Sequence, residues 1–368
     1  MEAKLATAAK EGRPLRIKLG IDPTAADIHL GFTVVLSKLR EFQDLGHTVV
    51  LIVGDYTARV GDPSGRSASR PVLSGAQIDA NAATFTEQAM TVLSPDNLEV
   101  RRNGEWLDMP AEDLFRLMRT TTAARILERD DFAKRWAAHT PISLLELLYP
   151  LLQGYDSVAV EADVELGGTD QKFNLLLGRD VQAAYGQGEQ VILTVPLLVG
   201  TDGKRKMSKS EGNYIGVTEP PEEMYGKTLS LPDEAMAEWY GLLLDDDVPA
   251  DASARDAKRA LARRIVARFH SAAAAGEAEA AFDRVHIAHE APADMPEVAF
   301  APEDGRIHLP ALVVAAFGGS RSEARRLVAQ GGVKLDGEAV ADLDVDAARV
   351  DGRVLQVGKR RFARVKLS

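Results

Sequence analysis

The chain has 368 residues, no cysteine and a net charge of −11, and 45% of its residues are hydrophobic and 27% charged. These values are typical of a globular protein of two or three domains, and they exclude disulfides and thiolate metal clusters. The N-terminus is polar, without the apolar segment of a signal peptide, and no uncharged apolar stretch is long enough to cross a membrane. We therefore expect a cytoplasmic protein without a membrane anchor.

The charge is unevenly distributed along the chain. Residues 318–368 contain 11 Lys and Arg against 7 Asp and Glu, and residues 358–367 are almost purely basic. An acidic body with a basic end indicates contact with nucleic acid. An exposed strand edge protected by Lys and Arg would give the same composition, so charge alone leaves both readings open.

The first half of the sequence alternates between strand and helix patterns. Residues 15–20 form a short apolar run that ends in glycine, hydrophobic residues then recur at helical spacing as far as Leu45, and residues 48–53 form a continuous β-branched run. Residues 190–199 read as another buried strand. The pattern predicts an α/β fold with a parallel, Rossmann-like sheet, in which ligands bind beyond the carboxyl ends of the strands.

The composition predicts three parts. An α/β domain over residues 1–217 is followed by a helical domain over residues 218–300, because residues 251–290 are rich in Ala, Arg and Glu and contain few β-branched residues. Residues 291–305 are rich in Pro and acidic residues and read as a linker. Residues 308–368 form a small third unit of helices followed by short strands.

A loop with two lysines is the most specific motif in the sequence. Lys206-Met-Ser-Lys-Ser210 follows the strand predicted at residues 190–199, and core packing does not require this composition. It could be a solvated charged loop. Alternatively, it could be a lid whose ammonium groups meet a triphosphate, with Gly203 and Gly212 as hinges.

A second motif lies between the first strand and the first helix. In the segment Asp22 to Gly31, helix-end amides favour phosphate binding, Gly31 permits close backbone approach, and His29 could donate to phosphate oxygens. A single histidine at such a position is more often a cap or a packing residue. The lysine loop, which follows later in the same predicted domain, favours the phosphate-binding reading.

Three polar residues share one face of a predicted helix. Tyr149, Gln153 and Asp156 are spaced i, i+4 and i+7 among leucines. The set could be a polar surface stripe, or it could bind a small polar ligand.

These motifs resemble the signatures of class I aminoacyl-tRNA synthetases. Residues 29–31 (HLG) resemble the start of the HIGH signature, and residues 206–210 match KMSKS. The resemblance implies that His29, Thr24, Lys206 and Lys209 are catalytic and stabilise the phosphates of ATP. It also implies a set of ATP-binding residues, namely Asp22, His29, Gly31, Asp170, Met207 and Lys209. Phe32 stands where the family usually has a second histidine, so the polar contact of that position is absent or is supplied by another residue.

Three further segments resemble the tyrosyl-tRNA synthetases. Residues 149–157 (YPLLQGYDS) are similar to their tyrosine-binding helix, residues 61–65 (GDPSG) to their GDPSG loop, and residues 167–171 (GGTDQ) to their GGSDQ segment. A buried carboxylate that accepts the substrate hydroxyl rejects phenylalanine by roughly 10⁴–10⁵. The resemblance implies a tyrosine-binding set of Asp62, Tyr149, Gln153, Asp156 and Gln171, with Asp170 on the ribose. Many bacterial members have a tyrosine that contacts the substrate hydroxyl where this chain has Lys18, but residues 18–24 (KLGIDPT) are similar to one bacterial subgroup. We therefore assign no contact with the substrate hydroxyl to Lys18.

The C-terminal residues 308–368 resemble an S4-type RNA-binding domain, in which Arg325, Arg326 and Lys334 would bind RNA. Together the resemblances imply a tyrosine–tRNA ligase that uses L-tyrosine, tRNA(Tyr) and ATP with Mg²⁺, without a dedicated metal site or a tightly bound cofactor, and that forms a homodimer. Two alternatives stay open. One is a catalytically silent RNA-binding relative, and the other is a synthetase specific for tryptophan.

Overall fold

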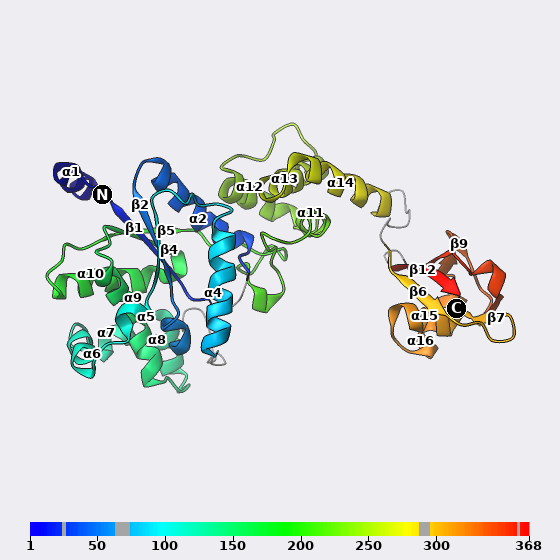
Figure 1. Ribbon diagram of the computed structural model, residues 1–368, viewed down its shortest axis with the longest axis horizontal. Helices are drawn as coiled ribbons and strands as arrows, with labels where there is room; N and C mark the ends of the chain where they lie inside the picture. The colour runs from blue at the N-terminus through cyan, green and yellow to red at the C-terminus, as the bar shows by residue number, and fades with distance from the viewer. Residues whose placement is uncertain (24–26, 63–73, 287–294, 359–360, 368) are drawn as a thin grey trace. The chain divides into compact units, whose positions relative to one another are not determined.

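The structure is a computed structural model, and it describes residues 1–23, 27–62, 74–286, 295–358 and 361–367. The chain divides into two compact units, Met1–Phe269 and His270–Ser368 (Figure 1). This division differs from the three parts predicted from composition, which remain a prediction. Among the described residues, none of the helices is both long and apolar enough to span a membrane.

The first unit is built on a five-stranded parallel sheet in the order β3-β2-β1-β4-β5. The middle strand, β1, pairs with β2 along its whole length and with β4 on its other side. The β-branched sequence of β2 is buried on both faces, as expected for an inner parallel strand. The strands are β1 (Arg16–Ile21), β2 (Thr48–Val53), β3 (Leu98–Arg102), β4 (Val164–Gly168) and β5 (Val191–Val195).

Helices cover both faces of this sheet. Figure 1 shows α2 (Leu30–Asp44) and α4 (Gly75–Ala89) on one face, and α9 (Leu144–Ala159) and α10 (Lys172–Ala184) on the other. The sequence fixes the start of α9 with a capping box, in which the Ser143 hydroxyl accepts from the backbone and the Glu146 carboxylate accepts from the Ser143 backbone N–H. The predicted Rossmann-like fold is confirmed, and the point where the strand order reverses lies between β1 and β4.

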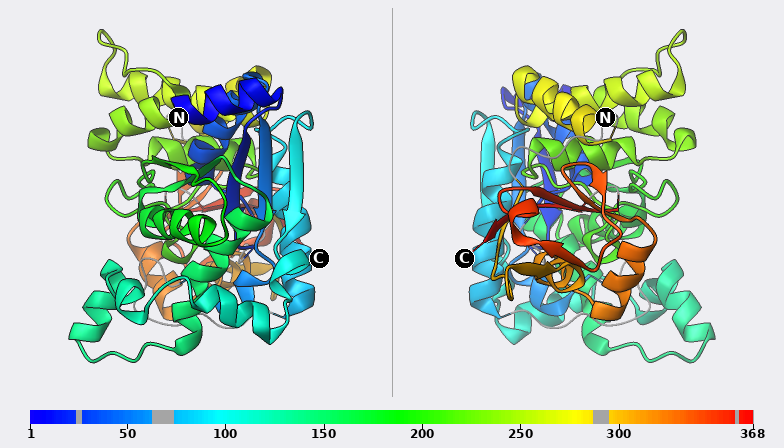
Figure 2. Two further views of the ribbon diagram at one scale, coloured as in Figure 1. Left: turned by 90° about the vertical axis from the view of Figure 1, so that its left-hand side faces the viewer. Right: turned by 90° about the vertical axis from the view of Figure 1, so that its right-hand side faces the viewer.

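The other helices of the first unit range from four residues in α3 and α5 to 16 residues in α13. The helices between β3 and α9 project beyond the sheet (Figure 2), and α11 packs against α13. Their bounds are α1 (Glu2–Glu11), α3 (Thr57–Val60), α5 (Gly104–Leu107), α6 (Ala111–Met118), α7 (Ala123–Leu127), α8 (Asp130–Ala137), α11 (Pro221–Leu229), α12 (Met236–Leu244) and α13 (Ala254–Phe269). Three single 3₁₀ turns are η1 (Thr169–Gln171), η2 (Lys209–Glu211) and η3 (Asp233–Ala235).

The second unit packs two sheets and a helix pair around one core of Val, Leu and Ile side chains. One sheet has the order β6-β12-β11-β8-β9, and β10 pairs with β7 in the other. The elements are α14 (Ala272–His286), β6 (Glu297–Phe300), β7 (Arg306–His308), α15 (Leu309–Phe317), α16 (Arg321–Ala329), β8 (Val333–Leu335), β9 (Glu338–Ala339), β10 (Asp344–Asp346), η4 (Ala347–Arg349), β11 (Val354–Val357) and β12 (Arg361–Leu367).

Two element predictions need correction. The linker predicted over residues 291–305 contains β6, which pairs with β12 because Val298 and Phe300 pack against the core of the second unit. The strand predicted over residues 190–199 is shorter and ends at Val195, since Pro196 has no N–H to continue the ladder.

Candidate active site

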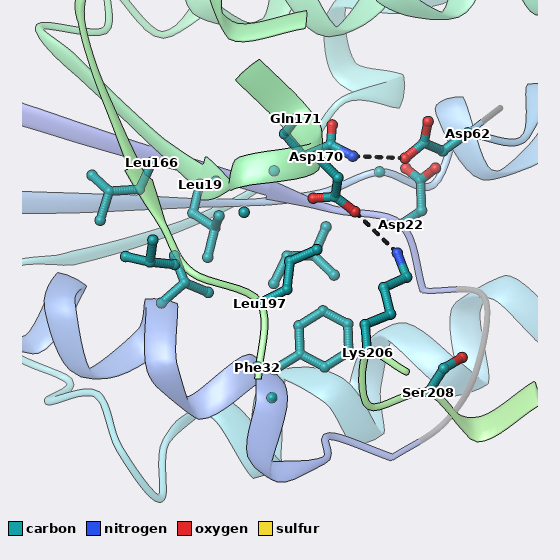
Figure 3. Close-up of a pocket in the computed structure, with 18 of the residues that line it drawn as sticks. Leu19, Asp22, Phe32, Asp62, Leu166, Asp170, Gln171, Leu197, Lys206 and Ser208 are labelled. Carbon is teal, nitrogen blue, oxygen red and sulfur yellow. Dashed lines mark hydrogen bonds and ion pairs between the residues drawn. The ribbon is translucent and has the colours of Figure 1, made fainter. Parts of the chain in front are cut away.

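A cavity of about 690 Å³ opens beyond the carboxyl ends of β1 and β4 in the first unit (Figure 3). This is where the strand order reverses, the usual ligand position in such sheets, and the volume suits a ligand of nucleotide size. Among the residues predicted for the site, those that line the cavity are Asp22, His29, Gly31, Asp62, Tyr149, Gln153, Asp156, Asp170, Gln171, Lys206 and Met207.

The cavity has an apolar and a polar side. Figure 3 shows Leu19, Leu166, Leu197 and Phe32 together on one side, and carboxylates with their partners on the other. Such a site can hold flat ring systems against the apolar wall while the polar groups fix charged parts of the ligand.

His29 is the N-cap of α2, and its Nδ1 accepts from the backbone N–H of Gly31 at 3.2 Å. Burial lowers its pKa to about 4, helped by the positive charges of Lys209 and Lys206. The ring is therefore neutral at physiological pH. Because Nδ1 accepts, the ring proton lies on Nε2, where it can be donated. A Cβ on residue 31 would lie 3.0 Å from the imidazole, which explains the glycine there.

Phe32 contributes only apolar packing at the position where the family signature usually has its second histidine. Its ring centroid lies 4.6 Å from that of His29 and 6.0 Å from that of Phe85. It therefore supports the imidazole by packing and supplies no hydrogen bond.

The two lysines of the KMSKS loop are paired with carboxylates from other segments. The Lys206 ammonium lies 3.0 Å from Asp170 (Figure 3), and the Lys209 ammonium lies 3.0 Å from Asp27. Lys206 lines the cavity, whereas Lys209 does not, although its charge acts on His29. Met207 is buried and anchors the loop through a backbone hydrogen bond to Leu198.

Asp22 and Tyr149 form the centre of an acidic cluster. The Tyr149 hydroxyl donates to Asp22 at 3.0 Å, and the Thr57 hydroxyl donates to the other oxygen of the same carboxylate at 2.6 Å. Burial raises the pKa of Asp22 to about 7, and the nearby charge of Asp62 adds to the effect. The Asp22 carboxylate thus lies beside residues that were predicted to bind tyrosine, although the resemblance implied an ATP-binding role for it. A cationic group brought to this cluster would relieve the repulsion between its carboxylates.

Asp156 lies on the same face of α9 as Tyr149, and it is 3% exposed. The Trp106 indole N–H donates to one carboxylate oxygen at 2.9 Å, and the Asn103 amide lies 3.4 Å from the other. Burial raises the pKa of Asp156 to about 6, against the effect of Lys18 and of both donors. At neutral pH the group is therefore a mostly ionised acceptor that faces the cavity.

An amide network orients the two glutamines of the site. The Asn174 amide donates to the side-chain oxygens of Gln153 at 2.9 Å and of Gln171 at 3.1 Å. Gln171 in turn donates to Asp62 at 3.0 Å (Figure 3). The network fixes the orientation of each amide, and it joins segments predicted separately from the sequence.

Sequence reasoning missed the residues that support the site, among them Asn103, Trp106 and Asn174. Trp106 lies on α5, Asn103 directly precedes that helix, and Asn174 lies on α10. No local pattern marks these residues. Thr24 and residues 63–65 of the GDPSG segment lie outside the described residues. Within the part of the chain that the structure describes, no three His, Asp or Glu side chains are grouped to hold a metal ion.

Comparison with known proteins identifies the family. Residues 10–286 match the family described as tRNA synthetases class I (W and Y), and residues 309–345 match the S4 domain. The tyrosine–tRNA ligase of Moorella thermoacetica is 52% identical over 380 residues, which cover 99% of this chain and 91% of that protein. The chain belongs to the tyrosyl-tRNA synthetase family. The resemblance seen in the sequence motifs is thereby confirmed.

Other members of the tyrosyl-tRNA synthetase family match to a similar extent. Tyrosine–tRNA ligase 2 of Vibrio vulnificus is 51% identical over 378 residues, which cover 100% of this chain and 95% of that protein. Among solved structures, the Archaeoglobus fulgidus tyrosyl-tRNA synthetase complexed with L-tyrosine has a TM-score of 0.60 at 23% identity, with 75% of this chain and 94% of that chain covered. At this identity the structural similarity shows the fold alone.

Proposed function

We propose that this chain is a tyrosine–tRNA ligase, which activates L-tyrosine with ATP and transfers the tyrosyl group to the 3′ end of tRNA(Tyr). The observation that carries the proposal is the buried Asp156 carboxylate, oriented by Trp106 and Asn103 as an acceptor at the wall of the cavity. A buried carboxylate that faces a cavity as an acceptor suits a ligand that ends in a hydroxyl.

The acidic cluster would bind the other end of the amino acid. The substrate ammonium would meet Tyr149, Gln153 and Asp62, with Gln171 beside them. Asp22 lies in the same cluster, and its raised pKa reflects a negative charge that a bound ammonium would stabilise. The apolar wall of the cavity leaves space for the aromatic ring.

ATP with Mg²⁺ would occupy the part of the cavity near the KMSKS loop. His29 presents a neutral Nε2–H donor, and Lys206 and Lys209 supply the positive charge that a triphosphate requires. To reach the phosphates, the two lysines would exchange their carboxylate partners for phosphate oxygens. This exchange would also release Asp170 to accept from the ribose. Gly31 and Met207 line the same region and would contact the nucleotide.

Transfer to tRNA requires an RNA-binding surface, for which we propose the S4 domain. Arg325 and Arg326 are exposed on α16, and Lys334 lies on β8, which follows α16 after the Gly331–Gly332 turn. Positive side chains placed in this way suit a phosphate backbone. Within the proposed assignment, residues 1–217 would be the catalytic domain, residues 218–300 a helical anticodon-binding domain and residues 308–368 the S4-type domain. The cytoplasmic location also stays a prediction.

We also propose a homodimer that forms through the helices between β3 and α9 together with the start of α9. Five large apolar side chains are exposed there, which is unusual for a free surface. They are Phe115 (56% exposed), Met118 (44%), Trp136 (66%), Leu144 (82%) and Leu145 (48%). The helices between β3 and α9 project beyond the sheet (Figure 2), and none of the five side chains lines the cavity, so a second copy could cover them without closing it.

The test of the proposed activity is ATP–pyrophosphate exchange with tyrosine, tryptophan or phenylalanine as the only amino acid. We expect exchange with tyrosine, and at most trace exchange with the other two. Exchange with tryptophan alone would replace the proposal by a tryptophan-specific enzyme. Absence of exchange with all three would favour a catalytically silent relative.

A further inference from the structure

Beneath the predicted tyrosine-binding face of α9 lies a buried ion pair that the mechanism above does not use. The Lys18 ammonium on β1 lies 2.8 Å from the Glu165 carboxylate on β4, and their side chains are 0% and 1% exposed. The two residues are register partners on adjacent parallel strands. The desolvation of two buried charges can cost more free energy than their mutual attraction contributes, so stability alone is a weak reason for such a pair.

The Lys18 ammonium also binds α9 on both sides of Asp156. It donates to the backbone carbonyl oxygen of Gln153 at 3.0 Å and to the hydroxyl of Ser157 at 2.8 Å. With Glu165, these two acceptors use all three ammonium protons. The same Glu165 carboxylate accepts from Ser157 at 3.2 Å and lies 3.4 Å from the Gln153 amide. The ion pair thus fixes both neighbours of the acceptor on the helix.

We propose that Lys18 is a specificity-determining positioning residue, whose buried positive charge keeps Asp156 an ionised acceptor for the ring hydroxyl of the substrate. This inference rests on the proposed function, because it assigns a role within tyrosine recognition. Lys18 does not touch the substrate. It acts through the electrostatic field of its ammonium at Asp156 and through its contacts with Gln153 and Ser157 on either side of Asp156.

The charges around Asp156 support this role. Lys18 is the favourable charge with the largest effect on its pKa, and it acts against burial, whereas Glu165 on β4 raises the pKa by a smaller amount. Asp22, which follows β1, adds a further negative charge, and its own pKa is raised by the presence of Asp156. Trp106 on α5 and Asn103, which directly precedes that helix, supply neutral donors only.

The test is the ratio of kcat/KM for tyrosine to that for phenylalanine, measured by ATP–pyrophosphate exchange across pH 5 to 8. Both amino acids carry the same ammonium, so titration of the acidic cluster cancels in this ratio. Lys18→Met should move the midpoint of the ratio, the pH at which half of the discrimination is lost, to higher pH. The pKa of Asp156 is about 6, so a rise of about one unit should lower the ratio by roughly twofold at pH 7 and by roughly fivefold at pH 6.

Glu165→Gln separates a role in specificity from a purely structural one. It keeps the Lys18 charge and removes the opposing carboxylate, so we expect the midpoint to move to lower pH while discrimination at pH 7 is retained. If the pair only holds the fold, both substitutions should lower thermal stability and leave the midpoint of the ratio where it is in the unmodified protein.

Arg135→Met is the matched control, because Arg135 forms a half-buried ion pair with Glu146 at the start of the same helix, away from the cavity. It should lower stability without moving the ratio. Midpoints that stay fixed, or that shift in the same direction for Lys18→Met and Glu165→Gln, would overturn the inference. Failure of the proposed function would look different, since the unmodified protein itself would then show no tyrosine-dependent exchange.

Discussion

Replacement of Asp156 by asparagine changes one atom of the predicted hydroxyl acceptor. The Asn103 amide cannot flip to accommodate the new side chain. Its oxygen accepts from the backbone N–H of Tyr56 at 3.0 Å, and its nitrogen donates to the Thr57 hydroxyl at 3.0 Å. The Trp106 N–H requires the remaining acceptor. The new side chain would therefore either present an NH₂ group to the cavity or place that NH₂ group against the N–H donor of Asn103 or Trp106 in the cavity wall.

The size of the effect follows from these contacts. A hydrogen bond to a charged group contributes roughly 1.5–3 kcal/mol, so kcat/KM for tyrosine should fall roughly 10- to 100-fold. Phenylalanine would no longer leave a buried carboxylate without its donor, so kcat/KM for that substrate should rise. Together we expect the preference for tyrosine over phenylalanine to fall by roughly 10²–10³ in Asp156→Asn, because an unpaired acceptor accounts for most of such discrimination.

The assay is ATP–pyrophosphate exchange with each amino acid, together with a thermal unfolding curve of each variant. Tyr155→Phe is the control, since it also alters a polar group on α9, but one whose ring packs against Tyr185 with centroids 5.3 Å apart and does not line the cavity. A preference that is unchanged in a folded Asp156→Asn protein would refute the assignment of the pocket.

Four further predictions concern other parts of the molecule. Lys206→Ala should lower kcat for exchange by roughly 10²-fold with little change in KM for tyrosine, whereas Lys204→Ala in the same loop should have no effect. The pKa of His29 is lower in the folded state than in the unfolded chain, so its contribution to stability is complete above pH 6.5 and is lost as the pH falls toward 4. The melting temperature of the unmodified protein should therefore fall more steeply over that range than that of His29→Asn. Arg325→Glu combined with Arg326→Glu should weaken tRNA binding and flatten its salt dependence without changing exchange, while Arg349→Glu in the same unit should leave binding as it is. Trp136→Lys should convert the dimer to a monomer in sedimentation velocity measurements. A sedimentation coefficient that the substitution leaves unchanged would rule out this surface as the interface.

Local patterns predicted much of the fold and of the site. The β-branched run at residues 48–53 and the helical spacing before it placed β2 and α2, because burial on both faces of a parallel strand leaves a continuous apolar signal. The spacing of Tyr149, Gln153 and Asp156 predicted their common face, since a single regular helix sets their relative positions. All three line the cavity.

Contacts between distant segments could not be predicted in the same way. Lys18 looks like an exposed residue in the strand pattern, and only its pairing with Glu165, 147 positions later, makes its burial possible. Asp156 owes its orientation to Asn103 and Trp106, which lie 53 and 50 positions earlier in the chain. The strand at Glu297–Phe300 was missed because acidic and proline residues surround it and its partner is the last strand of the chain.

The most direct measurement is a crystal structure of the protein with a non-hydrolysable tyrosyl-adenylate analogue bound. We predict that the phenol oxygen lies within hydrogen-bonding distance of Asp156, the ammonium beside Tyr149, and the phosphate facing Nε2 of His29. An analogue bound outside this cavity, or bound with its phenol ring away from Asp156, would contradict the account.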